Sequence, residues 1–104
     1  MKNNLNHTDD VQMLRSDITA AMPNLAQHHE QWWLLGTSSC HLCEVAEQLL
    51  TRLQAVQNIT YQNVDISEFD EPLMLRFAMS IPVLLTKNQR LDYPFSVLDL
   101  QRLL

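Results

Sequence analysis

Glycine is almost missing from this chain: of its 104 residues, only Gly36 is a glycine. The phosphate-binding loops of nucleotide-binding proteins and the calcium loop of EF-hands need glycines at fixed positions. Their backbones turn sharply there or approach the ligand closely. No such pattern surrounds Gly36, so the sequence excludes these nucleotide- and calcium-binding classes.

Positive charge is also scarce. Seven Lys and Arg residues stand against twelve Asp and Glu residues, which leaves a formal net charge of -5. The sequence contains no run of basic residues, whereas proteins that bind nucleic acid through its phosphates carry a basic patch. We therefore expect no nucleic-acid partner.

Long apolar segments are absent too. The longest apolar runs, such as residues 32–35, are far shorter than the roughly 20 residues that cross a bilayer. The opening residues MKNNLNHTDD lack the apolar core of a secretory signal peptide. These absences predict a cytoplasmic protein without a membrane partner.

A length of 104 residues fits one domain of ordinary size.

Strand-like and helix-like segments alternate from residue 32 onward. Short apolar runs predict buried strands because they are too short for buried helices. Apolar residues at helical spacing predict the helices between them. We expect strands at residues 32–35, 59–66, 81–85 and 90–93, and helices at residues 42–56, 71–78 and 97–104.

This order, β-α-β-α-β-β-α, predicts an α/β domain over residues 32–104 with a four-stranded mixed sheet and flanking helices. Residues 1–31 form a separate N-terminal extension. Thr8-Asp9-Asp10 offers an N-cap, and apolar residues from Val11 to Ala21 predict a short amphipathic helix that ends before Pro23. This helix packs on its own domain, associates with another chain or forms a tail; we favour packing.

Cysteine occurs only as Cys40 and Cys43, too few for a disulfide-rich scaffold or a four-cysteine zinc site. The pair lies between an expected buried strand and an expected helix. Residues three apart on a helical turn have Cβ atoms about 5–6 Å apart, which is close enough for a disulfide. The helix N-terminus stabilises a thiolate on Cys40, and Cys43 lies one turn deeper. This asymmetry predicts an attacking thiol and a resolving thiol, with His41, when protonated, favouring the thiolate further.

Four motifs carry a family resemblance: Cys40-His41-Leu42-Cys43, Val64-Asp65-Ile66, Ser80-Ile81-Pro82-Val83 and Leu91-Asp92-Tyr93-Pro94-Phe95. In this order they resemble the thioredoxin superfamily, and above all its small glutaredoxin-like proteins with a C-H-L-C motif. The resemblance covers residues 32–104 and implies a thioredoxin-like fold. It implies that Cys40 is the nucleophile and Cys43 the resolving thiol. It also implies a cis Ile81-Pro82 bond beside the cysteines, with the backbone of Ile81 binding an extended substrate segment.

The chain departs from glutaredoxins where they bind glutathione. Glutaredoxins usually have a basic residue near the first strand and paired glycines before the last helix. Here no Lys or Arg lies between Arg15 and Arg52, and Pro94-Phe95-Ser96 stands where the glycines would fall. Ser96 and Asp99 resemble a capping box at the start of the last helix, with Asp in place of the usual Glu or Gln. That start, near Ser96, still offers a contact for a carboxylate. We expect no required cofactor, no bound metal and glutathione only as a doubtful co-substrate.

The sequence thus predicts a thiol–disulfide oxidoreductase that is a monomer or a weak dimer. Its substrates would be disulfide-containing proteins or small-molecule thiols, and glutathione or a thioredoxin-type donor would supply the electrons. Two alternatives stay open. One is a non-catalytic zinc or iron–sulfur carrier that uses the same cysteines, and the other is a redox-inert adaptor that binds a partner through residues 1–31.

Overall fold

A mixed sheet forms the centre of the protein. The computed structural model describes residues 3–104, with side chains from residue 10 onward. Within that range four strands form one sheet in the order β2-β1-β3-β4. The central strand β1 (Trp32–Gly36) pairs in parallel with β2 (Tyr61–Asp65) and antiparallel with β3 (Val83–Leu85), which pairs antiparallel with β4 (Arg90–Asp92). The predicted α/β fold is therefore confirmed.

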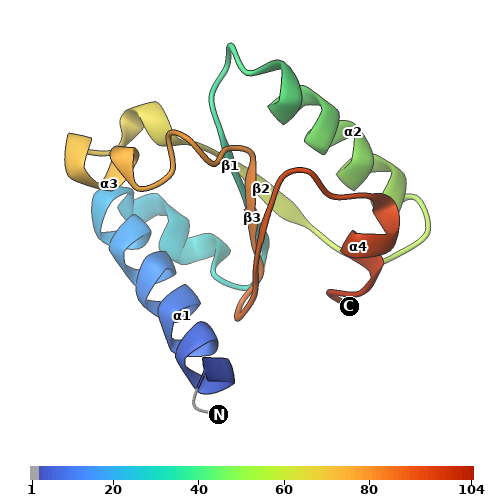
Figure 1. Ribbon diagram of the computed structural model, residues 1–104, viewed down its shortest axis with the longest axis horizontal. Coiled ribbons are helices and arrows are strands. Elements are labelled where there is room, and N and C mark those ends of the chain that lie inside the picture. The colour runs from blue at the N-terminus through green and yellow to red at the C-terminus, as the bar shows by residue number, and fades with distance from the viewer. Residues whose placement is uncertain (1–2) are drawn as a thin grey trace.

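Helices cover both faces of the sheet (Figure 1). On one face lie α1 (Asn3–Ala21) and α3 (Glu71–Leu75), and on the other lie α2 (His41–Gln54) and α4 (Val97–Gln101). Two short 3-10 helices, η1 and η2, follow α1 and β2 and span Pro23–His28 and Ile66–Glu68. No helix within residues 3–104 is long and apolar enough to cross a membrane.

The strand β1 divides the hydrophobic core into two clusters because its side chains alternate between the two faces of the sheet. Trp33 and Leu35 pack in the cluster under α1 and α3, whereas Leu34 packs in the cluster under α2 and α4. All three side chains are at most 2% exposed. This burial on both faces explains why the sequence of the strand is a continuous apolar run.

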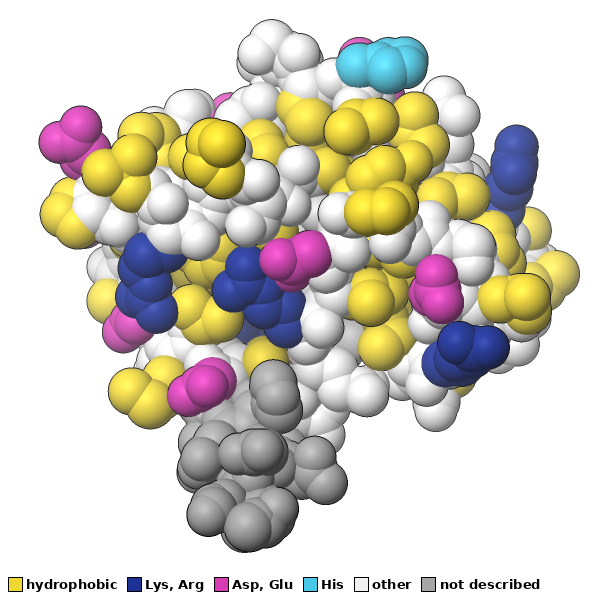
Figure 2. Space-filling model, viewed as in Figure 1, with side chains coloured by type: hydrophobic (Ala, Val, Ile, Leu, Met, Phe, Trp, Pro, Cys, Tyr) yellow, Lys and Arg dark blue, Asp and Glu magenta, His cyan; other side chains and the backbone are white. Residues whose placement is uncertain are grey.

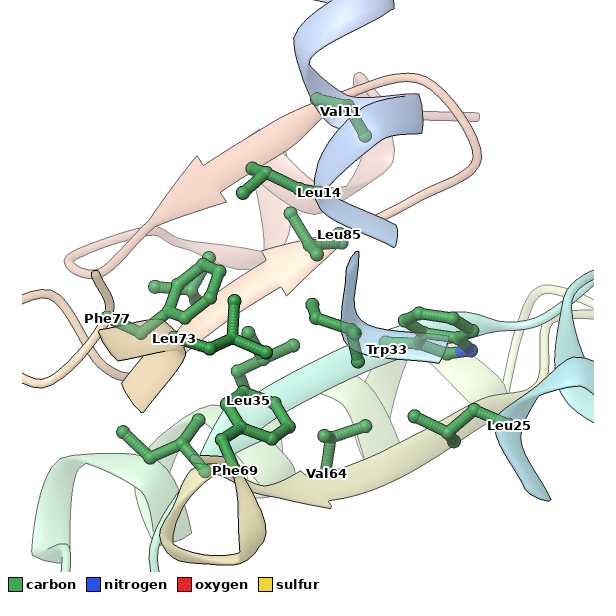
Figure 3. Packing of buried hydrophobic residues seen from close by; sticks show 13 residues of the cluster. Val11, Leu14, Leu25, Trp33, Leu35, Val64, Phe69, Leu73, Phe77 and Leu85 are labelled. Carbon is green, nitrogen blue, oxygen red and sulfur yellow. The ribbon is translucent and has the colours of Figure 1, made fainter. Parts of the chain in front are cut away.

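The N-terminal extension packs into the core of its own domain. Val11, Leu14 and Ile18 of α1 are buried in the same cluster as Trp33. Figure 3 shows Leu14 close to Leu85 of β3, so α1 lies directly over the sheet. This packing of the residues from Val11 onward is the arrangement that we favoured, whereas the side chains of residues 1–9 lie outside the described part of the structure.

The predicted start of α1 was wrong. The helix begins at Asn3 and runs through Thr8-Asp9-Asp10, which the sequence suggested as its N-cap. No glycine or proline occurs between Asn3 and Ala21, so no residue in this segment strongly disfavours the helix. A potential cap residue favours a helix start without imposing one.

Arg15 joins α1 to the sheet. Its side chain is only 7% exposed, and the guanidinium lies 3.8 Å from the centre of the Trp33 ring. Burial lowers the pKa of Arg15, and the nearby Glu30 carboxylate opposes that shift. A buried cation is stable only when its donors are satisfied. Here it donates four hydrogen bonds to backbone carbonyls, namely those of Leu85 (3.2 Å), Thr86 (3.1 Å), His29 (2.8 Å) and Gln31 (3.1 Å).

Several elements are shorter than the sequence predicts. The helix expected to reach residue 56 ends at Gln54, and Val56 is 69% exposed. The strand expected from residue 81 begins at Val83, because Pro82 has no N–H to donate to a neighbouring strand. Four further elements are also shorter. The strands expected at residues 59–66 and 90–93 span Tyr61–Asp65 and Arg90–Asp92, and the helices expected to reach residues 78 and 104 end at Leu75 and Gln101.

We predict that replacing Arg15 by Met lowers the free energy of unfolding by about 2–3 kcal/mol, because buried carbonyls lose a charged donor. Urea unfolding measures the loss. Arg76→Met is the matched control, because Arg76 pairs with Asp17 at 3.0 Å on the surface, and exposed pairs contribute about 0–1 kcal/mol. Equal losses in the two variants would show that Arg15 does not anchor α1.

Candidate redox site

Cys40 and Cys43 form a disulfide whose Cα atoms lie 5.2 Å apart. A short turn after β1 leads into it, and α2 begins directly behind it (Figure 1). Cys40 is the N-cap of α2, where its Sγ accepts a hydrogen bond of 3.1 Å from the Cys43 N–H. The predicted placement of the pair at a helix N-terminus is confirmed.

The two cysteine residues differ in exposure. Cys43 is buried, with 7% of its surface exposed, whereas Cys40 is partly exposed. An external sulfur therefore reaches the pair more readily through Cys40 than through Cys43. This is the asymmetry that an attacking and a resolving thiol require.

Gly36 lies against the inner cysteine. A Cβ placed on Gly36 would be 2.7 Å from Cys43 Sγ and 3.1 Å from Cys43 Cβ. Its φ angle is not positive, so the position needs the absence of a side chain rather than the conformational freedom of glycine. Sequence reasoning missed this residue as part of the site. The available signal was the chain's one glycine at the end of a buried strand, just before the cysteine motif.

The register of the sheet brings Pro82 to the same place. Leu35 pairs with Val83, so the next residues along the two antiparallel strands, Gly36 and Pro82, lie opposite each other. The Ile81-Pro82 peptide bond is cis, as the resemblance implied. A second cis bond, Tyr93-Pro94, was not predicted. Gly36 contacts Cys43 on one side and lies opposite Pro82 on the other. The disulfide and the cis-proline therefore lie at the same end of the sheet.

His41 points into solvent. Its Nδ1 lies 3.8 Å from Glu44 Oε1, and the two side chains are 84% and 64% exposed. Water screens charges at such exposed positions. The tuning of the Cys40 thiolate by His41 therefore stays a prediction, and its effect is weakened by solvent.

A pocket of about 330 Å³ opens beside Cys43, between α2 and the carboxyl ends of β1 and β2. Three carboxylates line it, from Glu44, Glu47 and Asp65, and none of its described lining residues is Lys or Arg. Asn63 donates a hydrogen bond to the Glu47 carboxylate across the pocket. The space next to the inner cysteine therefore combines an apolar lining with three acidic side chains.

The donors of Ser96 are already used within the protein. Its N–H and hydroxyl contact Asp99 Oδ2 at 2.9 and 3.2 Å, and its hydroxyl accepts from the Asp99 N–H at 3.2 Å. This is the predicted capping box at the start of α4. The bond from the Ser96 N–H lowers the pKa of Asp99. An ionised carboxylate of the protein thus occupies the donors that a bound carboxylate would need.

The pair does not belong to a larger set of metal ligands. Among the described side chains, no group of three or more His, Cys, Asp or Glu residues is arranged to hold a metal ion. Zinc sites need three or four protein ligands, and iron–sulfur clusters commonly need four. Cys40, Cys43 and the outward-facing His41 do not meet this requirement without ligands from another molecule.

The mixed sheet, the disulfide at the start of α2 and the cis-proline define a thioredoxin-like thiol redox protein. The family described as Glutaredoxin-like domain (DUF836) matches residues 31–104, and the chain belongs to this family. Its structure is similar to the X-ray structure of Northeast Structural Genomics target protein XcR50 from X. campestris. The two chains are 27% identical with a TM-score of 0.59, over 69% of this chain and 92% of that one. No curated protein sequence matches this chain.

We predict that Asp99→Asn destabilises the protein at neutral pH and has little effect in acid. Because the folded pKa of Asp99 is lowered, its contribution to stability is present above the unfolded pKa. That contribution is lost as the pH falls through the folded value. Unfolding free energies at about pH 7 and about pH 2 measure this change. Asp10→Asn, at an exposed site, is the control. A difference between Asp99→Asn and the parent that persists in acid would contradict the assignment.

Proposed function

We propose that this protein is a thiol–disulfide oxidoreductase that cycles Cys40 and Cys43 between a disulfide and a dithiol. The observation that carries the proposal is the disulfide itself, which has one accessible sulfur at the N-cap of α2 and one buried sulfur behind it. The family membership of residues 31–104 supports the same chemistry.

In the reducing direction, the Cys40 thiolate attacks one sulfur of a substrate disulfide. A bond forms between Cys40 and that sulfur, the substrate S–S bond breaks, and the other substrate sulfur leaves as a thiolate. Cys43 then loses its proton to solvent and attacks Cys40 Sγ, which releases the second substrate thiolate and closes the internal disulfide. Two electrons have passed to the substrate, and two external thiols later return the pair to the dithiol.

The start of α2 supports the role of Cys40 in this cycle. The first turn of a helix has N–H groups without helical partners, and the helix dipole is positive at that end. The Cys43 N–H already points at Cys40 Sγ at 3.1 Å. When the disulfide is reduced, the same N–H is placed to stabilise a thiolate on Cys40.

Ile81 would bind an extended substrate segment through its carbonyl. Its N–H donates to the Phe77 carbonyl at 3.1 Å and is therefore used within the protein. Among the described residues no backbone N–H outside the regular strands and helices donates to the Ile81 carbonyl. A substrate N–H can pair with it, next to Pro82, as strand addition requires.

Charge around the site favours neutral or cationic substrates over glutathione. Figure 2 shows Lys and Arg side chains at separate positions on one face of the molecule, most of them beside Asp or Glu. Several are in ion pairs, namely Arg76–Asp17, Arg90–Asp92 and Arg102–Asp99. The carboxylates in the pocket beside Cys43 have no such basic partner among its lining residues. Glutathione carries two carboxylates, and charges within about 8–10 Å interact despite physiological salt.

We predict that Cys40→Ser abolishes reduction of a disulfide dye, whereas Cys43→Ser forms a stable mixed disulfide through Cys40. The reason is that only Cys40 is accessible and only Cys43 is placed to release the adduct. Dye assays and intact-protein mass spectrometry measure the two effects, with Ser39→Ala as a control beside the motif. Dye turnover by Cys40→Ser at the parent rate would contradict the mechanism. So would freshly purified parent protein that contains zinc or iron and fails to reduce the dye.

We predict that cysteamine, a cationic thiol, reduces the disulfide faster than mercaptopropionate, an anionic thiol. Each rate is normalised to the same thiol's reaction with an uncharged disulfide. The ratio of the normalised cysteamine rate to the normalised mercaptopropionate rate is expected to be on the order of 2–5 at low salt. It should fall as the salt concentration rises. Replacing Glu44 and Glu47 by Gln should lower it, whereas Glu68→Gln, outside the pocket lining, should not. A ratio independent of salt and of these carboxylates would contradict the electrostatic argument.

A further inference from the structure

Gly36 contacts the buried half of the redox pair from the strand side. We infer that Gly36 is a positioning residue that sets the equilibrium between the disulfide and dithiol forms of Cys40 and Cys43. Its missing side chain leaves the space in which Cys43 Sγ lies when the disulfide is closed. This inference rests on the proposed function in one respect, namely that the pair cycles between the two forms.

The space at Gly36 is too small for a methyl group. A Cβ at this position would lie 2.7 Å from Cys43 Sγ, far inside the roughly 3.5–4.0 Å at which heavy atoms attract each other. It would also lie 3.1 Å from Cys43 Cβ, so a rotation of the sulfur relieves only part of the contact. The remainder requires the first turn of α2 to move away from β1.

The strand β1 cannot easily move away from Cys43. Gly36 pairs with Asp65 of β2 on one side, and the register sets Pro82 opposite it on the other. The preceding residues, Leu34 and Leu35, are buried in the two core clusters. Because close-packed interiors transmit strain instead of absorbing it, an added methyl group at position 36 acts mainly on the cysteine.

The disulfide and the dithiol forms respond differently to the steric contact with a methyl group at position 36. In the disulfide, Cys43 Sγ is bonded to Cys40 Sγ, and Cys40 is held as the N-cap by bonds from the N–H groups of Cys43 and Glu44 to its carbonyl, at 3.2 and 3.3 Å. In the dithiol, the bond between the sulfurs is gone, and Cys43 can turn to another staggered rotamer. A methyl group at position 36 therefore disfavours the disulfide more than the dithiol. Glycine at this position keeps the disulfide form favourable.

The experiment measures the fraction of disulfide in Gly36→Ala and in the parent protein. Each is equilibrated in buffers of reduced and oxidised glutathione, from both directions, and the thiols are trapped and counted by mass spectrometry. In Gly36→Ala the equilibrium constant for disulfide formation is expected to fall at least ten-fold, which corresponds to a rise of about 30 mV in the reduction potential. An unchanged equilibrium constant would overturn the inference.

Ala46→Val separates positioning from general damage. Ala46 is fully buried in α2 and packs in the cluster of Leu34, and only atoms of Cys43 lie within 4 Å of a Cβ at position 36. The larger side chain should destabilise the fold by overpacking and leave the redox equilibrium where it is. If Ala46→Val shifts the equilibrium as much as Gly36→Ala does, Gly36 has only a structural role and the inference fails.

A second variant keeps the test decisive if Gly36→Ala folds poorly. In a Cys43→Ala background the sulfur that meets the new methyl group is absent, so Gly36→Ala should cost less unfolding free energy there than in the oxidised parent. An equal cost in both backgrounds would overturn the inference. The result is independent of turnover: a parent protein inactive on disulfide substrates would sink the proposed function, while a shift in Gly36→Ala would still establish the positioning role.

Discussion

The burial of β1 on both faces is the constraint on which the rest of the structure depends. Its alternating side chains supply both core clusters, so the strand is fixed in direction, register and depth. A strand held in this way delivers its last residue, Gly36, to one defined point. The disulfide, the cis-proline and the end of β2 all meet there. The redox site is thus built at the end of a strand that is buried on both faces, although the cysteines themselves follow a turn.

The site combines two opposing electrostatic features. The start of α2 offers the Cys43 N–H to the outer sulfur of Cys40, and this favours a thiolate. The pocket beside Cys43 carries carboxylates, and Asp99 occupies the donors at the start of α4. Positive charge is therefore supplied to the reacting sulfur by backbone groups rather than by Lys or Arg. Such a site fits the proposed preference for neutral or cationic substrates.

The N-terminal extension lies outside the matched family region, which begins at residue 31, yet it completes the core. The apolar side chains of α1 cover one face of the sheet, and Arg15 ties the helix to carbonyls at the ends of β3 and η1 and over the Trp33 ring. The sheet face that carries Trp33 and Leu35 needs a covering element, because exposing these large apolar side chains to water is unfavourable. In this chain the extension supplies that cover.

The sequence by itself determined the order of the elements, the central strand, the capping box at Ser96 and the placement of the cysteine pair before a helix. These features follow from local periodicity, from cap residues and from spacing along the chain. Only the tertiary structure decided the roles of Gly36, Arg15 and Asp65, because each depends on a partner distant in the chain or on a register between strands. It also decided that Ser96 serves Asp99 and that His41 faces solvent. Periodicity shows which residues are apolar, whereas the three-dimensional packing determines which atoms touch.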